Sequence, residues 1–211
     1  MKRIIFIVIL VSSVIGMLIF NFCCSIQSPT DELQNNFTKC QIKDLEKITS
    51  FFKNQICKDQ AYDFEICFKE FFSQVYANNQ RVIWGYFDFD KQQELYGSIS
   101  KSTFDEIWSF SKYTRYKDKG EFKSICSSFN GKYQKFVSEV GINNESIKKY
   151  ASGLAGKGAF EDIFMLLGRI NENPKNFDFS DPNIQLILSV HCLSLIDLYK
   201  RREPWKDLNN N

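Results

Sequence analysis

The stretch from Ile184 to Tyr199 would be apolar on nearly all sides if it formed a helix. Such a helix must be covered by other elements all round, so it belongs in the middle of a bundle. Asp181 and Pro182 stand just before it, and a capping acid followed by a first-turn proline is typical of a helix start. We therefore predict a mainly α-helical, bundle-like single domain built around this segment.

Amphipathic helices are expected to cover the central segment. Apolar residues recur every three or four positions from Ile42 to Ile56 and from Ala61 to Val75, with polar residues between them. This spacing is the period of a helix with one buried face. Further helices are predicted over 133–140, from Asn144 onward and from Gly158 onward; Asn130 and Gly131 are also a hairpin signal, but their flanks alternate poorly, so the helix is preferred.

The middle of the chain has the least regular pattern. Arg81 to Leu95 fits either a short strand or a packed loop, so one short β element is compatible with the fold class. Thr103 and Glu106 have capping-box spacing, which predicts a helix that begins there and continues through Ser111. The charged stretch 112–120 is expected to form a surface loop.

Gly153 to Gly158 is superficially similar to a phosphate-binding loop. Ala151 stands where that pattern requires its first glycine, and Gly158 replaces the serine or threonine that would contact magnesium. We therefore expect a loop between helices here rather than a nucleotide site.

The N-terminus predicts export from the cytoplasm. Lys2 and Arg3 precede an almost entirely apolar run from Ile4 to Phe20. A short basic segment followed by such a run is the pattern of a secretory signal or a membrane anchor, and its positive end stays in the cytoplasm. The rest of the chain is then extracytoplasmic (periplasmic, on the cell surface or secreted), and a retained 4–20 segment would anchor it in the membrane.

Three fates of this N-terminal segment are open. The segment is cleaved before Ile26, or it is retained as an anchor, or Cys23 (alternatively Cys24) is lipidated as in a bacterial lipoprotein. The bulky residues from Phe20 to Phe22 depart from the usual lipoprotein pattern. The predicted organisation is a signal peptide or membrane anchor (1–25), a polar spacer (26–36), a helical extracytoplasmic domain (37–206) and a polar tail (207–211).

The charge balance argues against nucleic acid as a partner. The chain has 27 basic and 25 acidic residues, and two of the basic ones are Lys2 and Arg3, so the exported part is formally neutral. A neutral domain lacks a general attraction for phosphate backbones. A hydrophobic content of 44% is typical of a packed domain rather than a disordered chain.

The cysteines do not define one disulfide pattern. Seven cysteines include the adjacent pair at 23 and 24, and the odd remainder cannot all pair within the chain. Cys40, Cys57 and Cys67 are close enough in sequence to be disulfide candidates in an oxidising compartment. Cys67 and Cys192, however, lie in apolar helical surroundings that are typical of buried free thiols. No C-x-x-C pair is present, so neither a zinc knuckle nor a thiol redox motif is indicated.

His191, Ser194 and Asp197 are the residue types of a catalytic triad, but their spacing argues against one. Successive residues of a helix are rotated by about 100°, which directs Asp197 away from His191. A core histidine with satisfied contacts is the expected interpretation. Asp88 and Asp90 lack the glycine and the final acid of an EF-hand loop. We therefore predict no catalytic residues, no metal and no cofactor.

The segment around Trp84 is the candidate binding site. Trp84, Tyr86, Phe87 and Asp88 combine aromatic and acidic side chains in an irregular stretch, as binding surfaces do, although packing under a loop is equally compatible. The favoured hypothesis is a non-enzymatic extracytoplasmic protein-interaction domain with a protein partner, for example an immunity or inhibitor protein. The alternatives are a small secreted hydrolase that uses carboxylates within Trp84–Glu94 and a structural envelope lipoprotein.

Overall fold

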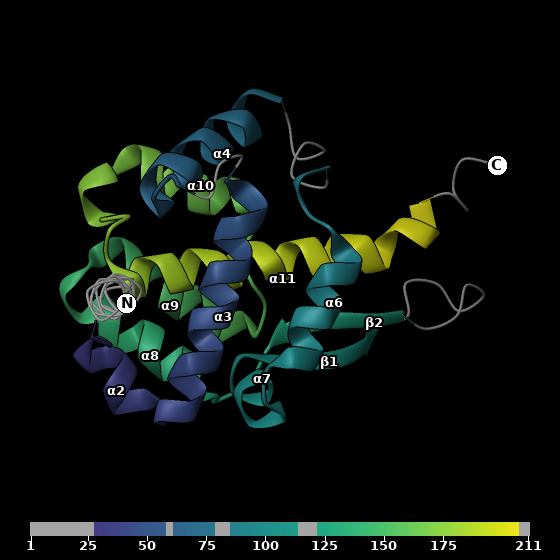
Figure 1. Cartoon of the computed structure of the whole chain (residues 1–211), viewed down its shortest axis with the longest axis horizontal. Coiled ribbons are helices and arrows are strands. Elements are labelled where there is room, and N and C mark those ends of the chain that lie inside the picture. Colours follow the sequence, from purple (N-terminus) through teal and green to yellow (C-terminus); the bar gives the residue numbers. More distant parts are fainter. Residues whose placement is uncertain (1–27, 58–60, 79–84, 114–121, 207–211) are drawn as a thin grey trace, which may run out of the picture.

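The computed structural model describes residues 28–57, 61–78, 85–113 and 122–206, and these segments are mainly helical with one small two-stranded sheet (Figure 1). The predicted fold class is therefore confirmed. The N-terminal segment 1–25, Trp84 and the tail 207–211 lie outside the described residues. Within the described residues, no helix combines the length and the apolar character that a membrane crossing requires.

Helix α11 (Pro182–Lys206) runs through the middle of the domain (Figure 1). The Asp181 side chain accepts a hydrogen bond from the backbone N–H of Asn183 at 2.8 Å, so the predicted cap is present. Side chains on all sides of the helix are fully buried, among them Ile187, Leu188, Val190, Leu193 and Ile196. The predicted central helix is thus confirmed.

The other helices surround α11. In chain order the described ones are α2 (Asp31–Asn36), α3 (Lys39–Ile56), α4 (Phe64–Asn78), α6 (Phe89–Ser98), α7 (Lys101–Ile107), α8 (Lys132–Val140), α9 (Glu145–Lys157) and α10 (Ile163–Glu172), with 3-10 turns at Gly141–Asn143 and Pro174–Asn176. Helix α3 packs against α11, while α4 and α10 lie together at one end of α3 (Figure 1). Helix α2 falls within the predicted polar spacer and buries Leu33.

Several predicted element boundaries are wrong. Ser100, and not Thr103, caps α7, because the Ser100 side chain accepts from the Thr103 N–H. The predicted loop at Gly153 belongs to the last turns of α9, which end at Gly158 in the left-handed conformation with φ of 61°. Helix α10 begins at Ile163 after the Asp162 cap rather than at Gly158.

The sheet is a β-hairpin: its first strand falls where the end of a helix and the start of a surface loop were predicted, and its second strand falls on residues for which no element was predicted. Strand β1 (Trp108–Tyr113) pairs antiparallel with β2 (Phe122–Ser127), and Phe110 stands opposite Ile125. The helix predicted to continue through Ser111 therefore stops at Ile107. The β element allowed between Arg81 and Leu95 is absent from the described part of that range, where α6 occupies the chain from Phe89 onward.

A disulfide joins Cys57, at the end of α3, to Cys67 in α4, with 5.0 Å between their Cα atoms. Of the two interpretations left open for Cys67, the structure has the disulfide, with the candidate partner Cys57, and not the buried free thiol. Cys192 is a buried free thiol as predicted, whereas Cys40 is a free thiol on the surface. The disulfide thus links the end of α3 to α4. Phenylalanines of these two helices pack against one another in the core.

Candidate functional site

A hollow of about 550 Å³ opens where α6, α7 and β1 meet. Its lining combines aromatic and aliphatic side chains with one amide and one ammonium group, and consists of Gln93, Tyr96, Gly97, Ile99, Lys101, Phe104 and Phe110. Concave surfaces that are mainly apolar and carry a few polar groups are typical of ligand sites and of interface pockets. We therefore consider this hollow the candidate functional site.

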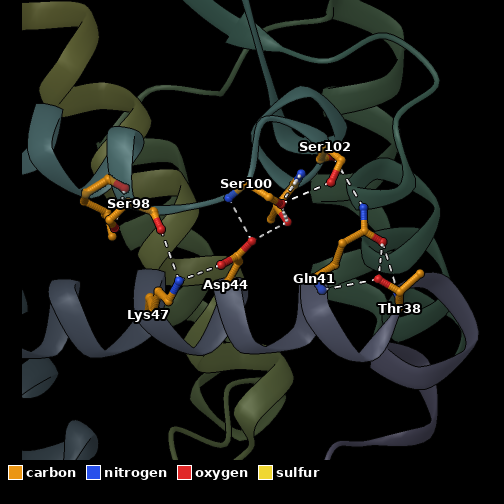
Figure 2. A network of polar contacts seen from close by, with 9 residues as sticks. Thr38, Gln41, Asp44, Lys47, Ser98, Ser100 and Ser102 are labelled. Atoms are coloured by element: carbon orange, nitrogen blue, oxygen red, sulfur yellow. Dashed lines mark hydrogen bonds and ion pairs between the residues drawn. The ribbon is translucent and has the colours of Figure 1, made fainter.

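The corner between α6 and α7 forms one wall of the hollow, and Asp44 of α3 holds it in place (Figure 2). One Asp44 oxygen accepts hydrogen bonds from the Ser100 backbone N–H and the Thr103 hydroxyl, both at 2.9 Å. The other oxygen accepts from Lys47 at 2.8 Å, and the same ammonium donates to the Ser98 carbonyl at 3.1 Å. Side chains of α3 therefore hold the backbone at Ser98 and Ser100, and this fixes the positions of Ile99 and Lys101.

These contacts determine the charge state of Asp44. Burial alone would raise the pKa of its carboxyl, but the hydrogen bonds from Lys47, Ser100 and Thr103 outweigh burial and hold the pKa well below its usual value. Asp44 therefore stays ionised throughout the physiological range. The stability that it contributes is present above the unfolded-state pKa and is lost only as the pH falls below that value.

Replacing Asp44 with alanine is expected to lower the free energy of unfolding by about 2 kcal/mol at pH 7, because the Ser100 N–H and the Thr103 hydroxyl lose a charged acceptor. Urea unfolding followed by circular dichroism measures the change. Exposed Asp90→Ala on α6 is the matched control and should change stability by less than about 0.5 kcal/mol. Equal effects of the two substitutions would contradict the bracing role of Asp44.

Arg201 of α11 holds two other lining residues of the hollow, Gln93 and Phe110, in place. Its guanidinium donates to both Asp197 oxygens, at 2.6 and 3.0 Å, and to the Gln93 side-chain oxygen at 2.8 Å. The same group lies 4.9 Å from the ring centre of Phe110 and 5.6 Å from that of Phe89. A planar guanidinium can form a bidentate ion pair with a carboxylate and can also stack on aromatic rings. Arg201 thereby ties α6, β1 and α11 together.

Asp197 is fully buried beneath this contact. Burial raises the pKa of its carboxyl, while the hydrogen bonds and charge of Arg201 and the amide of Gln93 lower it, with a net upward shift. Both Asp197 oxygens accept hydrogen bonds from Arg201, and one of them also accepts from Gln93. Asp197 is therefore a structural anchor for Arg201 rather than a group that a substrate could reach.

Aromatic side chains form the accessible part of the hollow. Phe110 is 42% exposed, and its ring stacks on that of Phe104 with 5.6 Å between centroids. Phe104 in turn contacts Tyr96 at 5.3 Å and Trp108 at 5.4 Å. The exposed ring is thus the outer member of an aromatic cluster whose inner members are packed into the fold.

The described residues of the predicted binding site have different surroundings. Phe87 is 5% exposed and stacks on Phe52, while Tyr86 is half-buried and meets Phe71 edge-on. Asp88 is exposed and caps α6 by accepting from the Lys91 N–H at 3.2 Å. A binding role for these residues and for Trp84 stays a prediction.

The triad residue types make separate contacts. The Nδ1 atom of fully buried His191 lies 3.2 Å from the Tyr150 hydroxyl. Ser194 accepts from the Trp108 indole N–H at 2.7 Å and donates to the Val190 carbonyl at 2.6 Å. His191 is therefore a core histidine as expected, but its Nε2 atom has no hydrogen-bond partner among the described residues, so the expectation that its contacts are satisfied is wrong.

Among the described residues, no group of three or more His, Cys, Asp and Glu side chains could hold a metal ion. A second hollow of about 330 Å³ lies between α2, α3 and the start of α11; its lining mixes leucine, isoleucine and proline with serine, threonine and glutamine side chains, and Glu46 is its one charged residue.

Comparison of the chain with protein-family models, with curated proteins and with solved structures finds no match. Phe110 and Arg201 were not among the predicted site residues; the available signals were the alternation of large and small side chains after Trp108 and the four-residue spacing of Asp197 and Arg201.

Proposed function

We propose that this protein is a non-enzymatic extracytoplasmic protein-interaction domain, and that the hollow between α6, α7 and β1 receives an apolar side chain of its partner. The observation that carries the proposal is the partly exposed Phe110 ring in a hollow with braced walls. Aromatic anchors in preformed pockets dominate the affinity of protein interfaces, because little ordering is needed when the partner binds.

Two features support the extracytoplasmic placement. The basic residues and the apolar run at the N-terminus have the pattern of an export signal or anchor. The Cys57–Cys67 disulfide is of the kind that persists in oxidising compartments. A secreted or envelope-tethered immunity or inhibitor protein, which acts by covering its partner, is a concrete form of this function.

The hydrolase alternative has weaker support. Within the segment Trp84–Glu94, Asp88 serves as a helix cap, and Asp90 and Glu94 are exposed but do not line the hollow. Asp197 lies behind the wall and is occupied by Arg201. A general acid or base requires a carboxyl group within reach of a bound substrate.

Capture of the partner from the native host tests the proposal. The full chain, tagged at its C-terminus, is cross-linked in cells and purified, and retained proteins are quantified by mass spectrometry. We expect one stoichiometric protein partner whose recovery falls at least about tenfold with Phe110→Asp, since a charge in the pocket opposes burial of an apolar group.

The matched control is Ile142→Asp, which adds the same charge at a position that is 72% exposed and outside the hollow. Thermal unfolding curves establish that both variants are folded. Recovery of the partner with Ile142→Asp and its loss with Phe110→Asp would support the proposal. Absence of any stoichiometric partner, or equal recovery with both variants, would overturn it.

A further inference from the structure

The charges around the Phe110 ring indicate what kind of partner segment fits the hollow, an inference that rests on the proposed function. The Lys123 ammonium lies 5.8 Å from the centre of the Phe110 ring, and the Arg201 guanidinium lies 4.9 Å from it. Cations placed over an aromatic face are attracted by its π electrons. The exposed ring therefore has two positive groups beside it.

The two cations differ in their availability. Arg201 is already neutralised by Asp197 and is largely buried. Lys123 is exposed, and in the described part of the chain it forms no ion pair with a carboxylate. An exposed ammonium group of this kind can pair with a carboxylate at the surface.

Lys101 adds a third cation on the other side of the hollow. Its side chain is 87% exposed and pairs with Asp105 on the same helix. A pair at this exposure contributes little stability, so the ammonium can exchange Asp105 for another carboxylate at little cost. Among the lining residues, Lys101 is the one that carries a formal charge.

We infer that the partner presents an acidic–aromatic segment, in which a large apolar side chain is flanked by carboxylates. The apolar side chain enters the hollow beside Phe110, and the flanking carboxylates pair with Lys101 and Lys123. The rings and methylene groups supply the apolar contact, whereas the lysines determine which flanking residues are accepted.

Peptide titration of the full ¹⁵N-labelled chain, followed by NMR, tests the inference. The probes are three blocked pentapeptides with the central sequences Glu-Phe-Glu, Lys-Phe-Lys and Glu-Ala-Glu. We expect Glu-Phe-Glu to shift the amide signals of Gly97, Ile99 and Phe110 and to bind about tenfold more tightly than Lys-Phe-Lys. The preference should shrink as salt is added, because exposed charges are screened.

The Lys123→Glu variant is expected to abolish the preference for the acidic peptide. The control is Lys148→Glu, which makes the same charge change on α9, where the lysine is exposed and outside the hollow. Its peptide preference should equal that of the natural chain.

The outcomes separate the inference from the proposed function. Equal binding of Glu-Phe-Glu and Lys-Phe-Lys at the hollow would overturn the acidic partner and leave the interaction site standing. Signal shifts with Glu-Ala-Glu as strong as those with Glu-Phe-Glu would overturn the role of the apolar side chain. The absence of shifts at the hollow with every peptide would overturn both the inference and the proposed use of this site.

Discussion

Replacing Phe52 with alanine is expected to lower the free energy of unfolding by about 4 kcal/mol. Phe52 is fully buried at the centre of an aromatic cluster formed by α3, α4 and the residues before α6. Its ring stacks on Phe87 at 5.7 Å and meets Phe71 edge-on at 6.0 Å, while Phe64 and Phe68 lie at 6.0 and 6.4 Å. Rigid rings on several elements cannot collapse into the cavity, so most of the lost contact stays lost.

Urea unfolding at pH 7 measures this loss. Phe129→Ala is the matched control, because the Phe129 side chain is 76% exposed and the same atoms are removed; its effect should stay within about 0.5 kcal/mol. If Phe52→Ala does not fold, Phe52→Leu is expected to lose about 1 to 2 kcal/mol and keeps the comparison possible. A loss below about 1.5 kcal/mol for Phe52→Ala would show that this half of the core is loosely packed.

The helices with a strong apolar period could be predicted because burial and periodicity agree in them. Helix α11 is central and apolar on nearly all sides from Ile184 to Tyr199, and α3 buries the apolar face expected from Ile42 to Ile56. Helix boundaries were less predictable, because several hydroxyl and carboxyl side chains compete for each cap. Ser100 and Thr103 both precede helical residues, and Asp44, distant in sequence, takes part in the choice through its hydrogen bonds to both.

The hairpin was missed for a definable reason. Phe104, Ile107 and Trp108 have helical spacing, which favoured a continuous helix through Ser111. The alternation from Trp108 to Tyr113 was the competing signal, and alternation is the pattern of a strand with one buried face. The structure follows both patterns, the helical one up to Ile107 and the alternating one from Trp108 onward.

The candidate site could not be predicted as a unit. Asp197 and Arg201 are four residues apart on one helix, so their ion pair follows from sequence spacing. The contacts of Arg201 with Gln93 and Phe110 join segments that are far apart in the chain, and only the packing of α6 and β1 on α11 creates them. Sequence alone drew attention to Trp84–Asp88, whose described aromatic residues serve mainly the core.

Acidification is expected to destabilise the fold through His191. The ring is fully buried, and burial lowers its pKa from 6.5 to about 3. Below pH 6.5 the unfolded chain therefore binds a proton that the folded chain does not accept until about pH 3. In this window each unit of acidification lowers the free energy of unfolding by up to about 1.4 kcal/mol, which amounts to about 2 kcal/mol between pH 7.5 and pH 5.

The groups around the ring do not offset this effect. Burial raises the pKa of the neighbouring Tyr150, Tyr133 and Cys192 side chains, so all three remain neutral in this range. The Nε2 atom of His191 has no hydrogen-bond partner among the described residues. The charge of Glu161 also raises the pKa of Tyr150, but this carboxylate already forms a bidentate ion pair with Arg169. A protonated imidazolium would therefore be buried without a counter-ion in contact.

Asp197 acts in the opposite direction and must be separated from the histidine. Its raised pKa makes the folded chain bind a proton before the unfolded chain does, which adds stability as the pH falls. Comparison with His191→Phe removes this contribution, since Asp197 is common to both proteins. Urea unfolding from pH 7.5 to pH 5 should show the natural chain losing about 2 kcal/mol relative to the variant.

Tyr150→Phe is the matched control for this comparison. It removes the hydroxyl that contacts His191 but leaves the ring buried, so the pH dependence of stability should persist. Parallel pH profiles for the natural chain and His191→Phe would mean that water or a neighbouring group already accommodates the charged ring. Divergent profiles would establish a neutral histidine in the core, which is incompatible with a proton-transfer role for His191 at neutral pH because such a role requires a pKa near the working pH.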